Sequence, residues 1–280
     1  MENFSPQNIK ELQKALGEMT NKTKVISGGT DLIMHLNNAI DIDGLLYLGK
    51  VEEMCKIEKT DDNVYIGGAV TMTQLVDSPL LCKKFQGIKD AAIDVGSEQI
   101  RNNGTIGGNI ANASPAGDLI PIVFMHNATI IIMGPKGQRE VNVNDFILGP
   151  NKTSLNYNEV LYKIKLPIPS DENYSTHFVK LGSRKKVTIS RICVALALTL
   201  KNDTVEDIGL YIGSISIKPI RLLDGEKIIK GKKITEDLKH QVSEILSKKI
   251  FGITPEEFDR DYKVWAAKGA IFDVFELFKA

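Results

Sequence analysis

The chain has 280 residues, of which 42% are hydrophobic and 25% are charged, and this composition is typical of a globular protein. Thirty-five basic residues balance thirty-five acidic ones, so no global field attracts nucleic acid or an anionic membrane, and we expect neither as a partner. No apolar run is long enough for a membrane span and the N-terminal sequence lacks the apolar core of a signal peptide, so we expect a cytoplasmic protein.

Apolar spacing and turn residues predict a mixed order of helices and strands. Ser5 and Pro6 suit the cap and the first residue of a first helix. Helical spacing predicts helices over 5–19, 30–40, 71–85 and 87–96, from Asp118 onward, and over 235–250 and 268–280. Apolar runs between turn residues predict strands at 23–27, 44–51, 63–72 and 159–169 and a hairpin over 128–146. Long antiparallel strands, or a helix plus strands, are expected over 176–203 and 205–222.

This irregular alternation favours an α+β fold over a regular βαβ winding. The proline-containing stretch 166–175 is the best domain boundary. We therefore predict one domain at 1–170 and a second at 171–280.

The cysteines and histidines are scattered along the chain. No two cysteines form a CxxC pair, and the histidines show neither an HExxH motif nor another paired-ligand spacing. We therefore expect no disulfide framework, no zinc ribbon, no chain-encoded iron–sulfur cluster and no metal site. The residues concerned are Cys55, Cys82, Cys193, His35, His126, His177 and His240.

The stretch KVISGGTDLI, residues 24–33, combines a strand, two glycines and a helix start. Glycines let the backbone approach a ligand closely, and unpaired N–H groups at a helix start point at negative oxygens. The pattern is compatible with anion binding, although a plain strand–turn–helix connection has the same pattern. Neither GxGxxG nor GxxxxGK[ST] is present, so Rossmann and P-loop folds are disfavoured.

The stretch GTIGGNIANASPAGD, residues 104–118, reads as a second glycine-rich loop. Its glycines surround Ile106, which would anchor the loop, and Asp118 can accept a hydrogen bond from a ribityl or ribose hydroxyl. Short donors and acceptors come from Thr105, Asn109 and Ser114. A diphosphate bound by uncharged groups needs such a lining. Two glycine segments therefore favour the binding of one long dinucleotide over a purely structural loop.

Four strings resemble, in the same order, the FAD-binding medium subunit of the xanthine dehydrogenase family of molybdenum hydroxylases. They are ISGGTDL, QIRNNGTIGGNIANASPAGDLIP, DFILGPNKTSLNYNEVLYKIKLPIP and FVKLGSR. The similarity covers roughly residues 1–200, and the remainder is consistent with that family's small C-terminal domain. The resemblance implies a PCMH-type FAD-binding fold of two α/β subdomains, divided near residue 55, followed by a smaller α+β domain.

The resemblance also implies which residues contact FAD. The diphosphate contact maps onto Val25, Ile26, Ser27, Gly28, Gly29, Thr30, Asp31 and Leu32. Diphosphate and flavin-side contacts map onto Thr105, Ile106, Gly107, Gly108 and Asn109, with single contacts at Asp118, Leu161 and Lys180. We expect no catalytic acid or base, because the protein's contribution would be positioning and redox tuning.

The chain departs from the family pattern in three places. Ser27 stands where Ala or Gly is common, and KKVTISRI after Arg184 lacks the Asp-containing motif of many members. The role of segment 184–191, expected near the flavin or the acceptor entry, therefore stays open. No cysteine-bearing insertion for an additional [4Fe–4S] cluster is present.

In this family a large molybdopterin subunit oxidises the substrate, and a small subunit relays electrons through two [2Fe–2S] clusters to the flavin. The resemblance therefore implies an FAD-carrying oxidoreductase subunit of a heteromeric complex, with NAD as the expected acceptor. Two alternatives stay open. One is a stand-alone flavin-dependent reductase of the same fold superfamily, and the other is a non-catalytic assembly protein.

Overall fold

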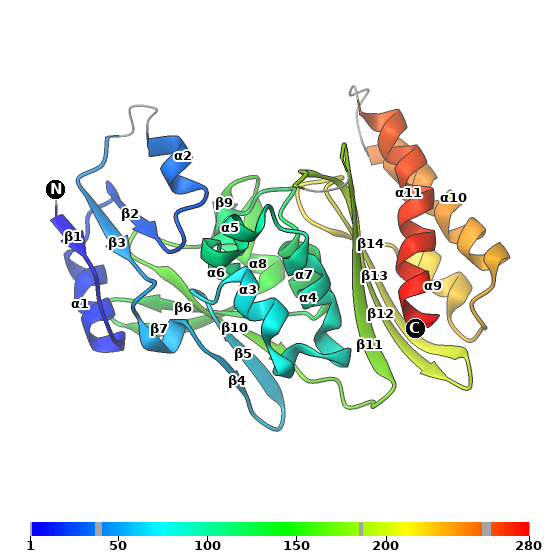
Figure 1. Ribbon diagram of the computed structural model, residues 1–280, viewed down its shortest axis with the longest axis horizontal. Helices are drawn as coiled ribbons and strands as arrows, with labels where there is room; N and C mark the ends of the chain where they lie inside the picture. Colours follow the sequence, from blue (N-terminus) through cyan, green and yellow to red (C-terminus); the bar gives the residue numbers. More distant parts are fainter. Residues whose placement is uncertain (1, 37–40, 185–186, 254–258, 280) are drawn as a thin grey trace. The chain divides into compact units, whose positions relative to one another are not determined.

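The computed structural model describes residues 2–36, 41–184, 187–253 and 259–279, and it shows a mixture of helices and antiparallel and parallel strands (Figure 1). The strands are β1 (Glu2–Phe4), β2 (Thr23–Ile26), β3 (Gly44–Tyr47), β4 (Ile57–Lys59), β5 (Asn63–Gly67), β6 (Thr129–Gly134), β7 (Gly137–Asn142), β8 (Ile147–Gly149), β9 (Lys152–Thr153), β10 (Val160–Pro167), β11 (Tyr174–Gly182), β12 (Ser190–Lys201), β13 (Thr204–Gly213) and β14 (Ile220–Arg221). The helices are α1 (Ile9–Glu18), α2 (Leu32–Leu36), α3 (Met72–Asp77), α4 (Gln86–Ile93), α5 (Glu98–Asn103), α6 (Ile106–Asn112), α7 (Leu119–Met125), α8 (Val143–Phe146), α9 (Leu223–Ile229), α10 (Glu236–Ile253) and α11 (Arg260–Glu276). The expected α+β class is confirmed.

The chain packs into two compact units, and each is built from separate stretches of sequence. The first unit comprises Met1–Leu80, Gly96–Ala113 and Asn127–Ile168. The second comprises Leu81–Val95, Ser114–His126 and Pro169–Ala280. Two short segments before residue 170, which contain α4 and α7, therefore pack with the C-terminal part of the chain.

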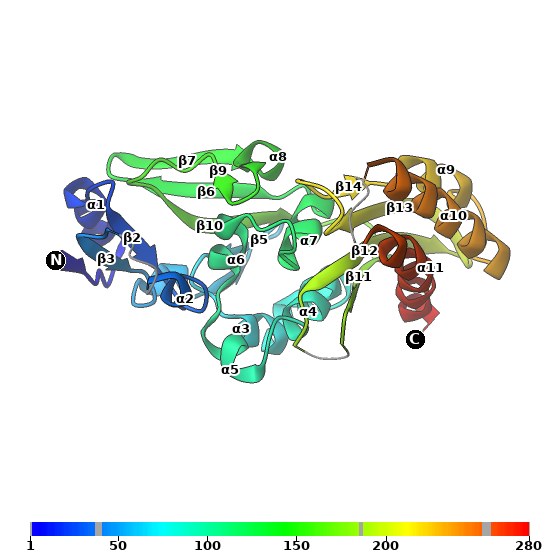
Figure 2. The ribbon, with the colours of Figure 1, turned by 90° about the horizontal axis from the view of Figure 1, so that it is seen from above.

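The first unit contains a small parallel sheet of order β1-β3-β2 and a five-stranded sheet of order β4-β5-β10-β6-β7. Figure 2 shows β6, β7 and β10 of the larger sheet side by side. Helix α1 joins the two sheets in one core, because Leu12 and Leu16 pack in the same apolar cluster as Leu46 of β3 and Met133 of β6. This shared core fixes the end of β2, where the first glycine segment begins.

The second unit is built on an antiparallel sheet of order β11-β12-β13-β14 (Figure 1). Helices α9, α10 and α11 cover one face of this sheet, and α4 and α7 cover the other. Strand β12 is buried on both faces, which explains its nearly continuous apolar sequence. The described residues of this region therefore form the long strands β11, β12 and β13, the first of the two arrangements expected.

Several element boundaries differ from the sequence-based predictions. The first helix begins at Ile9, because Asn8 rather than Ser5 is its cap and accepts from the N–H of Glu11 at 3.1 Å. The expected loop over 104–118 is wrong in its first half, which forms helix α6 after the short helix α5. Of the helix expected over 30–40, residues 37–40 lie outside the described residues, as do Lys185 and Lys186 of segment 184–191.

Candidate cofactor-binding site

The first glycine segment is a turn between β2 and α2. Val25 and Ile26 end β2, Leu32 begins α2, and Gly29 has a φ of +70°, which favours glycine. Within the described residues, the N–H groups of Gly28, Gly29 and Thr30 take part in no hydrogen bond. The turn therefore presents free backbone donors, as anion binding requires.

Ser27 adds an unpaired group to this turn. Its hydroxyl oxygen is buried and has no hydrogen-bond partner within the described residues. Buried polar atoms are nearly always paired in folded proteins, so an orphaned hydroxyl beside free N–H groups is the kind of atom that a bound ligand satisfies.

The second glycine segment is organised differently, because the N–H groups at the start of α6 are already used. The Ile106 N–H donates to the carbonyl of Val70 and the Gly107 N–H to that of Gly68, each at 3.0 Å. The Gly108 N–H donates to the capping hydroxyl of Thr105 at 3.2 Å. This helix start therefore offers no free donor at these positions, and its open feature is the exposed backbone at Gly108.

Gly107 and Gly28 lie where two stretches of backbone in the first unit pack too closely for a side chain. A Cβ atom on Gly107 would lie 2.3 Å from the carbonyl oxygen of Gly68, so α6 rests directly on the backbone after β5. A Cβ atom on Gly28 would lie 1.8 Å from the carbonyl oxygen of Asn103, so the two glycine segments touch each other. The structure thus brings together two segments that are separated by more than seventy residues of sequence.

Leu161 joins the same contact. It lies on β10, and its carbonyl oxygen would be 2.3 Å from a Cβ atom on Gly68, the residue on which Gly107 rests. Gly68 is therefore a residue of this site that the sequence reasoning missed. The pair Gly67-Gly68 inside the strand predicted over 63–72 is the signal that could have identified it, because glycine within a strand often marks the close approach of another backbone.

Asp118 and Lys180 form a buried ion pair in the second unit. Lys180 Nζ lies 2.6 Å from Asp118 Oδ2, and the two side chains are 5% and 7% exposed. Lys180 also donates to the backbone carbonyl of Asp94 at 3.1 Å. Asp118 Oδ1 is buried and has no partner within the described residues.

The burial of Asp118 and its contact with Lys180 together determine the pKa of the Asp118 carboxyl. Burial raises the pKa of its carboxyl to about 6, although the charge and hydrogen bond of Lys180 act in the opposite direction. Above that pH the ion pair holds one carboxylate oxygen, and the other is left to accept from a ligand hydroxyl or N–H.

Each unit, taken by itself, contains groups whose chemistry suits a part of FAD. In the first unit the free backbone donors of Gly28, Gly29 and Thr30 suit a diphosphate, and in the second unit Asp118 Oδ1 is an acceptor that suits a hydroxyl. The described residues contain no group of three or more His, Cys, Asp or Glu side chains placed to hold a metal ion. No helix in the described part of the chain is long and apolar enough to cross a membrane.

Comparison with known families matches both parts of the chain. Residues 1–169 match the FAD binding domain in molybdopterin dehydrogenase, and residues 177–277 match the CO dehydrogenase flavoprotein C-terminal domain. The first match alone covers more than half of the chain.

Sequence relatives agree with these matches. The chain is 32% identical to the glyceraldehyde dehydrogenase medium chain of Sulfolobus acidocaldarius, over 88% of each chain. It is 27% identical to the nicotinate dehydrogenase FAD-subunit of Eubacterium barkeri, over 97% of this chain and 94% of the relative.

Solved structures share the fold. The quinoline 2-oxidoreductase structure from Pseudomonas putida aligns with a TM-score of 0.88 at 22% identity, over 98% of this chain and 95% of that one. A Cu,Mo-CO dehydrogenase structure aligns with a TM-score of 0.87 at 22% identity, over 99% and 96%.

Fold and matches together define a flavoprotein oxidoreductase subunit whose cofactor is FAD. The chain belongs to the family of FAD-binding subunits of the molybdenum hydroxylases, which includes those of xanthine dehydrogenase and CO dehydrogenase. The family resemblance and the expected fold class are therefore confirmed.

Proposed function

We propose that this chain is the electron-transfer subunit of a three-part molybdenum hydroxylase. It receives electrons from the [2Fe–2S] clusters of a small subunit, which takes them from a large molybdopterin subunit, and it delivers them through FAD to NAD. The observation that carries the proposal is family membership over nearly the whole chain, together with a glycine turn whose N–H groups are free.

Relatives described as medium chains or FAD-subunits support the existence of partner chains. We infer that such partners hold the molybdenum and iron–sulfur centres, in line with the match to the FAD binding domain in molybdopterin dehydrogenase. The extents of the two family matches support a domain boundary near residue 170. A division of the first domain near residue 55 is part of the same proposal.

The residues would share the binding of FAD as follows. In the first unit, the N–H groups of Gly28, Gly29 and Thr30 would hold the diphosphate, with the Ser27 hydroxyl as a further partner. The flanking residues Val25, Ile26, Asp31 and Leu32 shape the turn. Around the second glycine segment, contact would come through the exposed backbone at Gly108 and through Asn109.

In the second unit, Lys180 would orient Asp118, whose free oxygen would accept from a hydroxyl or N–H of the cofactor. When bound, FAD accepts electrons one at a time and releases them as a pair, which suits a position between iron–sulfur clusters and NAD. The chain's own residues bind and position the flavin, and none is assigned as an acid or a base.

A visible absorption spectrum of the purified chain, followed by anaerobic addition of NADH, tests the proposal. A flavin spectrum that NADH bleaches is the expected result, since electron transfer to NAD is reversible. A flavin that NADH leaves oxidised, alone and with the partner chains, would exclude NAD as the acceptor and keep FAD. Steady turnover of NADH without partner chains would favour a stand-alone reductase. A colourless chain that takes up no FAD would favour an assembly protein.

A further inference from the structure

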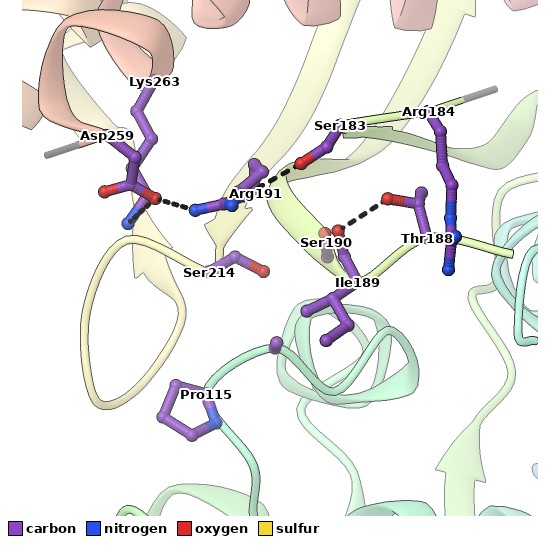
Figure 3. Close-up of a pocket in the computed structure, with 11 residues that line it drawn as sticks. Pro115, Ser183, Arg184, Thr188, Ile189, Ser190, Arg191, Ser214, Asp259 and Lys263 are labelled. Carbon is purple, nitrogen blue, oxygen red and sulfur yellow. Dashed lines mark hydrogen bonds and ion pairs between the residues drawn. The ribbon is translucent and has the colours of Figure 1, made fainter. Parts of the chain in front are cut away.

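The second unit contains a cavity of about 560 Å³ between the turn after β11 and the start of α11 (Figure 3). Much of its charged lining is paired, because Arg191 Nη1 and Lys263 Nζ lie 2.8 Å and 3.5 Å from the same oxygen of Asp259. Arg184 in its wall is followed by residues 185 and 186, which lie outside the described residues. We therefore assign no ligand to this cavity.

The first unit has an exposed aromatic residue at the edge of the sheet that carries the first glycine turn. Tyr47 is the last residue of β3, and its strand partner is Ile26, the last residue of β2. The two strands are parallel, so they end at the same edge of the small sheet (Figure 1). The turn with the free N–H groups of Gly28, Gly29 and Thr30 follows β2 at this edge. Tyr47 and the turn therefore share one edge of the sheet.

The ring of Tyr47 extends past the end of β3. A Cβ atom on Gly49 would lie 2.3 Å from the Tyr47 hydroxyl oxygen and 2.5 Å from the ring carbon Cζ, so Gly49 provides the space in which the ring lies. Tyr47 is 36% exposed, and its hydroxyl group has no hydrogen-bond partner within the described residues. The side chain therefore offers a ligand both ring surface and a free hydroxyl.

Apolar side chains lie on the same face of the sheet as Tyr47. Residues paired across two strands point to the same face, so Ile26 lies beside Tyr47, whereas Leu46 points into the core on the other face. Ile33 of α2 is 56% exposed. It meets Ile26 over Gly29, because a Cβ atom on Gly29 would lie 2.8 Å and 3.2 Å from their two Cδ1 atoms. The free N–H groups thus adjoin a partly exposed apolar surface, which suits a flat ring attached to a diphosphate.

The order of these elements indicates which ring this is. In dinucleotide-binding units with two adjacent parallel strands, the diphosphate lies at the glycine turn after the first strand, and a residue roughly twenty positions further on binds the adenosine ribose. Tyr47 stands at that distance from Gly28, at the end of the second strand of β2–α2–β3. The glycine fingerprint of those units is absent, so the correspondence lies in the order and direction of the strands. A tyrosine there replaces a carboxylate with a ring that can stack on a base.

We propose that Tyr47 holds the adenosine half of FAD by stacking on its adenine ring beside the diphosphate turn. Tyr47 is not among the residues that the family resemblance assigns to FAD. The inference rests on the proposed function, because it takes the turn after β2 as the place of the FAD diphosphate. FAD carries a second flat ring, the flavin, and experiments with the separate halves of the cofactor distinguish the two rings.

The test compares the full-length apoprotein with its variants Tyr47→Ala, Tyr47→Phe and Tyr157→Ala. Tyr157 is 58% exposed and lies in the same unit but outside the small sheet, so its variant controls for the loss of an exposed aromatic ring. Calorimetry gives the dissociation constants of FAD, ADP and FMN, and none of these measurements requires electron transfer. Urea denaturation of each apoprotein shows whether the variants keep the stability of the parent.

We expect Tyr47→Ala to weaken the binding of both FAD and ADP by roughly tenfold, as the loss of one stack between a base and an aromatic ring implies. FMN lacks the adenosine half, so its binding should be unchanged. Tyr47→Phe should keep most of the affinity for FAD and ADP because it keeps the ring. Tyr157→Ala should bind all three ligands as the parent does.

ADP binding by Tyr47→Ala that equals that of the parent would overturn the inference. A loss confined to FMN would assign the ring to the flavin, and equal losses for ADP and FMN would indicate a general disturbance of the unit, so either result would also overturn it. Tyr47→Phe binding as weakly as Tyr47→Ala would assign the contact to the hydroxyl and exclude stacking. A parent that binds ADP through Tyr47 but takes up no FAD would keep the adenosine site and overturn the proposed function alone. A parent that binds neither would overturn both.

Discussion

The carbonyl oxygen of Asn103 occupies the space that a side chain on Gly28 would need, since a Cβ atom there would be 1.8 Å from it. The turn after β2 therefore lies against the last residue of α5. Through this contact the two glycine segments of the first unit hold each other in place, independently of any ligand.

Replacing Gly28 with alanine should disturb both the fold and FAD binding. The methyl group meets backbone atoms, which cannot rotate away, so we expect a loss of roughly 1–3 kcal/mol in the free energy of unfolding. The free N–H groups of Gly29 and Thr30 would shift with the turn, and FAD content should fall. Urea denaturation of the apoprotein and the ratio of flavin to protein absorbance measure the two effects. Gly252→Ala is the control, because its added Cβ would meet no atom beyond its own helical turn, and helix propensity predicts an unchanged or slightly higher stability. Wild-type stability of Gly28→Ala would contradict a rigid contact.

Gly108→Val should separate FAD binding from stability. An added Cβ would meet only the Thr105 hydroxyl, at 3.0 Å, and the position is exposed, so the fold needs no more than a small shift of that hydroxyl. We expect the unfolding free energy of the apoprotein to change by less than about 1 kcal/mol, because valine and glycine differ little in helix propensity. FAD should nevertheless be lost, because the side chain covers the open backbone of α6. A variant that purifies fully flavinated would show that this backbone is not a cofactor contact.

The sequence pointed to both glycine segments as candidate ligand-binding loops, but the second one begins with a helix. Ser97 and Thr105 are good helix caps, and both do cap short helices, yet Gly104, Gly107 and Gly108 suggested a loop. Gly107 costs helix propensity, and its place in α6 is explained by its contact with the backbone of Gly68. That contact spans almost forty residues, so no local pattern could have predicted it.

The pairing of Asp118 with Lys180 was equally hidden. Family resemblance indicated each residue separately, but 62 residues separate them and nothing in either stretch encodes their contact. A strand at Lys180 was only one of the two arrangements that the sequence predicted for this region. Lys180 also contacts the backbone carbonyl of Asp94, which directly follows helix α4, and this contact brings together residues that are far apart in the sequence.

Removing one partner of the Asp118–Lys180 pair should cost more stability than removing both. Asp118→Asn leaves a buried ammonium group without its counter-charge, and Lys180→Met leaves a buried carboxylate, so each should lose roughly 3–5 kcal/mol. The double variant leaves neither charge and should lose clearly less than the sum. Urea denaturation at pH 7 of the four proteins gives the coupling free energy. Strictly additive losses would mean that the two groups do not interact.

His126 should make the second unit sensitive to acid. Its imidazole is buried between the rings of Phe85 and Tyr174, and Nε2 has no partner within the described residues. Burial lowers the pKa of His126 from 6.5 to about 4, because the charged form is disfavoured inside the protein. Above pH 6.5 the group is neutral in both states and contributes no pH dependence.

As the pH falls from 6.5 towards 4, the unfolded chain binds a proton at His126 that the folded chain does not, so stability falls by up to roughly 3 kcal/mol. His126→Leu should remove this part of the loss, which urea denaturation at pH 7, 6, 5 and 4.5 would detect. Asp118 changes the stability in the opposite direction over nearly the same pH range. Its pKa is raised to about 6 in the folded protein, so the folded chain binds a proton there before the unfolded chain does, and the stability rises as the pH falls below about 6. The decisive quantity is therefore the difference between variant and parent at each pH, with the exposed His35→Gln as control. A difference that stays constant from pH 7 to 4.5 would show that His126 does not carry the acid sensitivity.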